Sequence, residues 1–221
     1  MGPSSLTDRD LRQRAIVPPH RLADCRATVV GVGAIGRQVA LQLAAMGVPQ
    51  LQLIDFDVVE AVNLACQGYF EDDVGRTKVE ATAEQCHRLS GRLNIETVAS
   101  RFRRSGPVGN VLLCCVDSID TRRLIWQAVK DRVRFFSDGR MSAEVLRVLT
   151  VSDEASRRHY PTTLFDAGQA YEGACTARST IYCANVAAGL MLAQFTRWLR
   201  RLPVDADLQL NLLAGELTLM C

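Results

Sequence analysis

Residues 28–40, TVVGVGAIGRQVA, join a short run of β-forming residues to three closely spaced glycines and an amphipathic stretch. This order predicts a strand, a tight turn and a helix start, because Gly31, Gly33 and Gly36 let the backbone turn sharply and pack closely. Backbone amides at such a helix N-terminus can approach a phosphate group. The stretch therefore predicts a nucleotide site, without separating a dehydrogenase that holds NAD from an enzyme that uses ATP.

The rest of the 221-residue chain continues the alternation of strands and helices. Helices are expected at 34–46, 78–89, 121–130 and 180–200, and strands at 27–32, 50–57, 94–100, 110–117, 134–139 and 144–151. Gly47 is expected to end the first helix, and a closing hairpin is expected around Gly215. The alternation predicts an α/β fold: a Rossmann-like, mostly parallel sheet with antiparallel strands at its C-terminal edge and helices on both faces.

Segments without clear periodicity surround these elements. Residues 8–24 are expected to form a helix or arm ending near Pro18 and Pro19, residues 58–75 a loop, and residues 152–175 a longer loop. A long loop in a compact domain usually has a function or is mobile. We therefore expect one domain over residues 1–221, with an N-terminal arm at 1–24 and a crossover loop at about 152–175.

Composition and charge exclude several classes of protein. The net charge is only +2, and positive and negative side chains are mixed along the chain, which argues against nucleic-acid binding. The N-terminal residues do not resemble a signal peptide, and the longest apolar run is too short to span a bilayer, so we expect no membrane partner. Eight cysteines without a C-x-x-C pair argue against a zinc knuckle and favour free thiols in a reducing cytoplasm.

The segment after the second strand separates the two nucleotides. It reads LIDFDVVEAVNLACQGYFEDDVGRTKVEA over residues 53–81, and a later apolar strand ends in VDSIDTR at 116–122. These residues resemble the ThiF/MoeB/ubiquitin-activating adenylyltransferase superfamily, whose pattern is a glycine loop, L-x-D-x-D, N-L-x-R-Q and G-x-x-K. The arm LRQRAIV at 11–17 also resembles the R-Q-I arm of the family. The resemblance covers roughly residues 10–200 and agrees in order and spacing.

The resemblance implies a minimal, single-domain bacterial adenylyltransferase that joins a carboxylate to AMP and releases pyrophosphate. ATP and Mg²⁺ are the implied cofactors. Because a carboxylate and a triphosphate repel each other, Lys78 and Arg14 are expected to lie against the phosphates, Arg14 from the other subunit of a homodimer. Asp117 is expected to hold Mg²⁺ and Asp55 the ribose. The implied ATP-binding residues are Gly31, Gly33, Ala34, Ile35, Gly36, Asp55, Asp57, Asn63, Gln67, Lys78, Val116, Asp117 and Arg122.

Each of these residues also has a plain structural alternative. The glycines could form a turn without a ligand, Asp117 could cap the following helix, and Lys78 could be a solvated helix residue. Arg14 could be one of several arginines in a solvated arm. One residue departs from the family pattern, because Cys66 stands where N-L-x-R-Q has arginine. Arg37 or Arg76 could replace this cation, or adenylation could be weak.

Cys175, in EGACTARSTIY, is the candidate nucleophile for an acyl-transfer step. It precedes the helix expected at 180–200, and Arg178 adds positive charge, so the thiolate is favoured. Ubiquitin-activating relatives pass the acyl group to a cysteine on the loop before this helix. The alternative is a small half-buried residue at a helix cap. Cys183 is expected to lie in the core.

The resemblance implies that the carboxylate is the C-terminal glycine of a small ubiquitin-like protein of β-grasp fold. That partner could be a sulfur carrier or a modifier handed to a ubiquitin-conjugating type of enzyme, and the missing zinc pairs favour a compact bacterial ubiquitin-like conjugation system. Three alternatives stay open: adenylation of a peptide or tRNA-linked carboxylate, a catalytically weak scaffold of the same family, and an NAD-dependent oxidoreductase.

Overall fold

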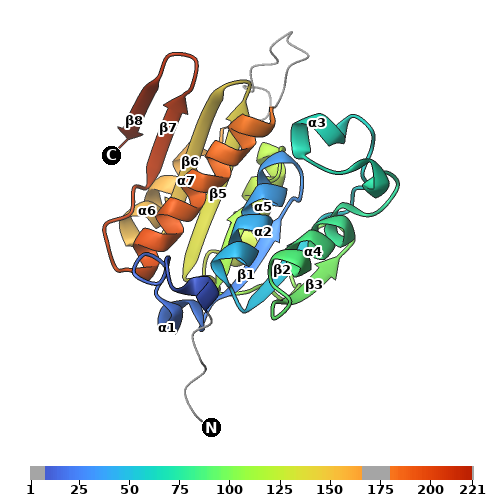
Figure 1. Cartoon of the computed structure of the whole chain (residues 1–221). Helices are drawn as coiled ribbons and strands as arrows, with labels where there is room; N and C mark the ends of the chain where they lie inside the picture. Colours follow the sequence, from blue (N-terminus) through green and yellow to red (C-terminus); the bar gives the residue numbers. More distant parts are fainter. Residues whose placement is uncertain (1–7, 166–179, 221) are drawn as a thin grey trace.

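A computed structural model describes residues 8–165 and 180–220. Its centre is an eight-stranded sheet in the order β3-β2-β1-β4-β5-β6-β7-β8 (Figure 1). The strands are β1 (Arg26–Val30), β2 (Gln50–Ile54), β3 (Asn94–Val98), β4 (Val111–Cys114), β5 (Phe135–Ser142), β6 (Val145–Val151), β7 (Asp207–Asn211) and β8 (Glu216–Met220). The first five strands pair in parallel and the last three join antiparallel, as the sequence predicts.

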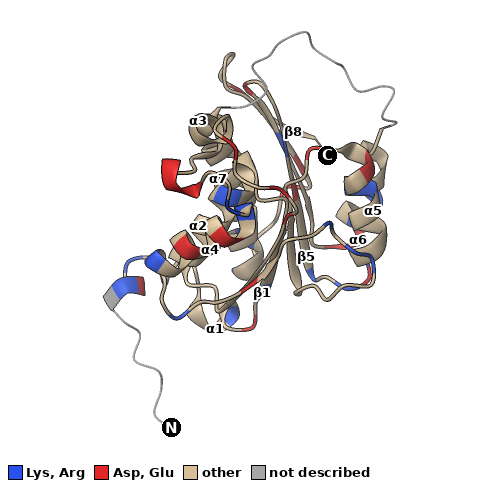
Figure 2. Cartoon of the chain, turned by 90° about the vertical axis from the view of Figure 1, so that its right-hand side faces the viewer, with Lys and Arg blue, Asp and Glu red and all other residues tan. Residues whose placement is uncertain are grey.

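Helices cover both faces of this sheet (Figure 2). The α-helices are α1 (Pro19–Leu22), α2 (Ala34–Met46), α3 (Asn63–Gln67), α4 (Lys78–Leu89), α5 (Ile119–Val129), α6 (Glu154–His159) and α7 (Ile181–Leu199). Helices α2, α4 and α7 lie on one face with a large apolar core, and α5 and α6 lie on the other with a smaller one. This arrangement confirms the predicted fold class, because a parallel sheet needs apolar cover on both sides.

Packing explains why two expected helices have the predicted bounds. Helices α2 and α4 occupy residues 34–46 and 78–89, and Gly47 ends α2 with a φ of 88°. In α7, which fills most of the helix expected at 180–200, the apolar face is buried from Ala184 to Leu199 against α2, β5 and β6. The sequence pattern predicts the bounds of long amphipathic helices best, because a whole apolar face of each helix must be buried against the core.

The first strand is shorter than expected, because it ends at Val30 and not at residue 32. Gly31 has a φ of 84°, which a strand residue with a side chain rarely adopts. Its amide donates to the carbonyl of Ile54 at 2.9 Å, so the turn is fixed to the end of β2. The chain then enters α2 directly, with Gly33 as the N-cap residue.

Short helices form in the three segments that lack clear periodicity. The N-terminal segment holds a 3-10 helix, η1 (Asp8–Asp10), and α1 begins at Pro19 where a helix was expected to end, because proline suits a first helical turn. The 58–75 loop contains α3 and the 3-10 helix η2 (Glu71–Asp73). In the 152–175 loop, α6 and η3 (Tyr160–Thr163) form, because Asp153 caps α6 through Ser156. Such short helices carry little periodicity.

The six described cysteines are free thiols, in agreement with the absence of a disulfide framework: Cys25, Cys66, Cys86, Cys114, Cys115 and Cys183. Cys183 is fully buried in the core, as expected. Within residues 8–165 and 180–220, we find no helix with the length and apolar character needed to cross a membrane.

Candidate functional site

The glycine turn forms a cradle at the carboxyl end of the parallel strands. A methyl group at Gly31 would lie 2.7 Å from the carbonyl oxygen of Cys115, and one at Gly36 would lie 1.8 Å from the carbonyl oxygen of Gly31. These contacts leave no room for a side chain, so α2 begins directly against the strand ends. Ala34 and Ile35 contribute the backbone of its first turn. The amides of this turn therefore face the point where the sheet ends, which suits a phosphate group.

Asp55 holds the glycine turn from the end of β2. Its carboxylate accepts hydrogen bonds from the amides of Val32 at 2.6 Å and Asp57 at 2.9 Å, and the residue is 9% exposed. The carboxylate still has lone pairs for a ligand, because each oxygen accepts one hydrogen bond from these amides. The predicted ribose contact stays a prediction, and the structure adds a role in shaping the turn.

Lys78 and Asp57 meet beside this turn. The ammonium of Lys78 lies 2.9 Å from the carboxylate of Asp57, and a bridge between Val58 and Thr77 closes the intervening loop. Lys78 is buried, so the alternative of a solvated helix residue is wrong. Asp57 is half exposed, which leaves one side of the ion pair open to solvent. A lysine held in this way is a point charge at the edge of the cradle.

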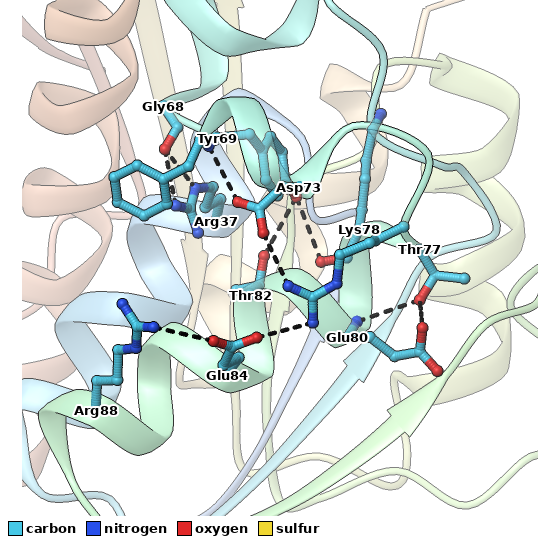
Figure 3. A network of polar contacts seen from close by, with 12 residues as sticks. Arg37, Gly68, Tyr69, Asp73, Thr77, Lys78, Glu80, Thr82, Glu84 and Arg88 are labelled. Carbon is cyan, nitrogen blue, oxygen red and sulfur yellow. Dashed lines mark hydrogen bonds and ion pairs between the residues drawn. The ribbon is translucent and has the colours of Figure 1, made fainter.

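Tyr69 is a site residue that the sequence reasoning missed. Its hydroxyl donates to the carbonyl of Val32 at 2.6 Å. The same hydroxyl lies 3.2 Å from the hydroxyl of Thr82 on α4 (Figure 3). Burial raises the pKa of this phenol well above its usual range, so the hydroxyl stays protonated. Tyr69 therefore fixes the glycine turn to α4, the helix that begins with Lys78. No motif marks it, since it is one aromatic residue in an irregular segment.

Two predicted residues of α3 lie close to the turn. The side-chain oxygen of Asn63 accepts a hydrogen bond from the amide of Glu60 at 2.9 Å, so Asn63 shapes the start of α3. The side-chain oxygen of Gln67 would lie 3.8 Å from a methyl group at Gly33. That oxygen is buried and has no hydrogen-bond partner within the described residues. An unsatisfied buried acceptor next to the cradle fits a site that a ligand completes.

The other side of the cradle follows β4. Val116 is half buried against the smaller core, and Asp117 is exposed. Ser118 caps α5 by accepting from the amide of Thr121, so the alternative that Asp117 is the cap is wrong. An exposed carboxylate that comes after a parallel strand, together with phosphate oxygens, is the donor set that Mg²⁺ favours. Within the described residues, no cluster of three or more acidic, histidine or cysteine side chains forms an all-protein metal site.

Arg122 is buried in the protein interior. Its guanidinium donates to Asp138 at 3.0 Å and to the carbonyl of Gly139 at 3.2 Å. Asp138 is fully buried and also accepts from Arg140 and Tyr160. These contacts give Arg122 a clear structural role, namely holding α5 against β5. Its predicted contact with ATP stays a prediction.

Arg14 lies far from the cradle of its own chain. The arm around it packs on the C-terminal end of α2, where Arg9 donates to the carbonyls of Ala44 and Ala45 and Gln13 donates to Met46. Since α2 begins at the cradle and spans 13 residues, its two ends are about 20 Å apart. Arg14 is exposed there, so it can serve a phosphate site only in another molecule. Cys175 lies outside the described residues.

The fold and the cradle together define an α/β nucleotide-binding protein of Rossmann-like topology. The ThiF family model matches residues 10–211, and the chain belongs to the ThiF family. The SAMP-activating enzyme E1 of Haloferax volcanii is 35% identical over 111 residues, covering 48% of this chain and 41% of that protein. The molybdopterin-synthase adenylyltransferase of Salmonella typhimurium is 34% identical over 107 residues, covering 46% and 43%.

Solved structures agree with the fold. The structure of E. coli MccB with ATP has a TM-score of 0.77 at 17% identity, covering 97% of this chain and 72% of that chain. At this identity the likeness concerns the fold alone. The alignments span less than half the length of the two curated relatives.

Proposed function

We propose that this chain is an ATP-dependent adenylyltransferase that activates the C-terminal carboxylate of a small ubiquitin-like protein of β-grasp fold. The observation that carries the proposal is the Lys78–Asp57 pair at the edge of the glycine cradle. Membership of the ThiF family and relatives named as an E1 activating enzyme and an adenylyltransferase support the reaction type. The named relatives do not specify the partner of this chain.

In the proposed reaction, a carboxylate oxygen attacks the α-phosphorus of ATP and the bond to the bridging oxygen of pyrophosphate breaks. The products are an acyl adenylate and pyrophosphate, so atoms and charge balance. The amides of the glycine turn bind phosphate oxygens, and Lys78 neutralises negative charge as the carboxylate approaches. Asp55 positions the turn and can bind the ribose. Mg²⁺ held by Asp117 would neutralise further phosphate charge.

Lys78 would favour ATP over NAD as the bound nucleotide. A dinucleotide presents a diphosphate between two sugars, whereas ATP ends in a free, highly charged triphosphate that benefits from a cation. Lys78 is held at the cradle by Asp57, and the buried oxygen of Gln67 faces the turn. An NAD-dependent oxidoreductase needs neither feature, so ATP is the nucleotide that the site favours.

Two further steps belong to the same proposal. Cys175 would take the acyl group from AMP as a thioester, and Arg14 would enter the site of a second subunit in a homodimer. A conjugating enzyme could then accept the acyl group. Free thiols at all described cysteines agree with a reducing cytoplasm.

Isotope exchange between labelled pyrophosphate and ATP tests the reaction. Exchange should require the chain, Mg²⁺ and a β-grasp protein with a free C-terminal glycine, and amidation of that glycine should abolish exchange. Exchange with a peptide instead of the β-grasp protein would point to another carboxylate substrate. Binding of the β-grasp protein without exchange would support the scaffold, and tight binding of NAD would contradict the proposal.

A thiol-sensitive adduct tests the role of Cys175. The wild-type chain should form a covalent adduct with the β-grasp protein that dithiothreitol releases, and Cys175→Ala should lose the adduct while keeping exchange. Cys66→Ala is the matched control and should keep both. An unaltered adduct in Cys175→Ala would assign the thioester to another residue.

A further inference from the structure

Arg37 is a buried cation that makes no ion pair with the described residues, and Asp73 acts on it only at longer range. It lies on the second turn of α2 and is 2% exposed, yet no described carboxylate comes within 4.0 Å of its guanidinium. One guanidinium nitrogen, Nη1, is buried and has no hydrogen-bond partner in the described residues. Burial lowers the pKa of Arg37. An unpaired buried charge is costly, and a protein retains one chiefly where it meets a ligand or a function.

Neutral contacts hold this guanidinium in one place. Its Nε and Nη2 atoms donate to the carbonyl of Gly68 at 3.0 and 2.7 Å, and the ring of Tyr69 lies 4.5 Å from its central carbon (Figure 3). A planar guanidinium satisfies both contacts, whereas an ammonium would make only part of them. These contacts fix the position of the charge, and none of them is an ion pair.

Arg37 belongs to the same helix start as the cradle. The amide of Arg37 donates to the carbonyl of Gly33 at 3.0 Å, so Arg37 follows the cradle by one helical turn, a rise of about 5.4 Å. Gly68, which accepts from the guanidinium, follows Gln67, whose unpaired side-chain oxygen lies beside Gly33. A polyphosphate in the cradle would therefore lie on the far side of Gln67 and Gly33 from a buried charge that salt screens only weakly.

The other candidate cation is already neutralised. Arg76 is 3.1 Å from Asp73 and 2.9 Å from Glu84, and its side chain is 39% exposed. Two carboxylates hold Arg76, whereas Lys78 has one carboxylate partner, so Arg76 carries no excess positive charge for a nucleotide. Of the two arginines considered as replacements for the cation missing at Cys66, only Arg37 is both buried and unpaired.

We infer that Arg37 supplies the positive charge behind the triphosphate that this chain lacks at Cys66. It acts as a positioning residue, because its guanidinium holds Gly68 and Tyr69 and does not itself touch the nucleotide. Tyr69 in turn holds Val32 in the glycine turn. The inference rests on the proposed function, since it needs ATP as the ligand of the cradle.

The test compares the dissociation constants of ATP and adenosine by calorimetry. Arg37→Met should raise that of ATP by about tenfold, because one weakly screened charge is lost near a polyanion, and should change that of adenosine less than about threefold. Arg37→Lys keeps the charge and should retain most of the ATP affinity. Arg76→Met, the matched control, should leave both constants unchanged. A purely structural role would weaken both ligands equally.

The outcomes separate this inference from the proposed function. If wild-type protein binds neither ligand, the proposed function fails and the inference fails with it. If the wild type binds ATP and Arg37→Met weakens ATP and adenosine alike, or neither, the inference alone is overturned. Should Arg37→Met not fold, Arg37→Lys decides: an ATP-selective loss of about tenfold in a variant that retains the charge would also overturn it.

Discussion

The ammonium of Lys78 lies 2.9 Å from the carboxylate of Asp57, although 21 positions separate the two residues. A backbone bond from the amide of Lys78 to the carbonyl of Asp57 at 3.0 Å reinforces the contact. The loop between them carries α3 and Tyr69, and both lie against the glycine turn. One loop closure thus brings the cation, the carboxylate and the cradle into a single site.

Replacement of Lys78 should remove a charge from this site. We expect Lys78→Met to lower the rate of pyrophosphate exchange by roughly a hundredfold, because a preorganised cation near a reacting phosphate is worth about 3 kcal/mol. Exchange assays at saturating ATP measure the effect. Lys130→Met, on an exposed residue at the end of α5, is the control and should exchange normally. Normal exchange in Lys78→Met would remove the lysine from the mechanism.

Close backbone packing at the glycine turn should make it intolerant of a methyl group. Gly36→Ala should destabilise the fold by at least about 2 kcal/mol, because the methyl group would meet the carbonyl of Gly31 at 1.8 Å. Thermal unfolding should show a melting temperature lower by roughly 4–8 °C. Gly189→Ala in α7 has no such neighbour and should be neutral or slightly stabilising. Equal stability of Gly36→Ala and wild type would contradict the packing.

Asp117 should be required for the metal-dependent step. Asp117→Ala should abolish exchange with Mg²⁺ while its melting temperature stays close to that of the wild type, because Asp117 is exposed and Ser118 caps α5. Asp131→Ala, on another exposed carboxylate, is the control. Wild-type exchange by Asp117→Ala at limiting Mg²⁺ would show that the metal is held elsewhere.

Thiol reactivity should follow burial. Burial raises the pKa of Cys25 to about 11 and the pKa values of Cys86 and Cys114 to about 12, so these thiols carry almost no thiolate at pH 8. Of these cysteines and Cys66, iodoacetamide should first label the half-buried Cys66. Mass spectrometry of the peptides measures the order, with unfolded protein as the control. Labelling of Cys86 in step with Cys66 would show that α4 opens readily.

Periodicity in the sequence predicts the sheet and its long helices well, because each such element buries one face. It predicts α2 and α4 to the residue. Periodicity fails for α3 and α6, which have five and six residues and therefore no complete apolar stripe. The bounds of β1 depend on the φ of Gly31, which a strand pattern does not contain.

Some residues of the candidate site could be predicted from the sequence and others could not. The resemblance implies that Asp57 and Lys78 belong to one ATP site; the structure brings their side chains within 2.9 Å of each other, and their contact with ATP stays a prediction. Tyr69 and the unpaired state of Arg37 depend on how an irregular loop folds over α2, so no spacing rule could predict them. The buried ion pair of Arg122 and Asp138 joins α5 to β5. The sequence does not show that these two side chains meet, because the contact depends on how α5 packs on the sheet.

The decisive experiment is a structure of the protein with a non-hydrolysable ATP analogue and Mg²⁺. We expect the triphosphate against the amides of residues 33–36, with the ammonium of Lys78 and the carboxylate of Asp117 both close to phosphate oxygens or the metal. A nucleotide bound with its phosphates away from Lys78 and Asp117 would show that the cradle is not an adenylation site.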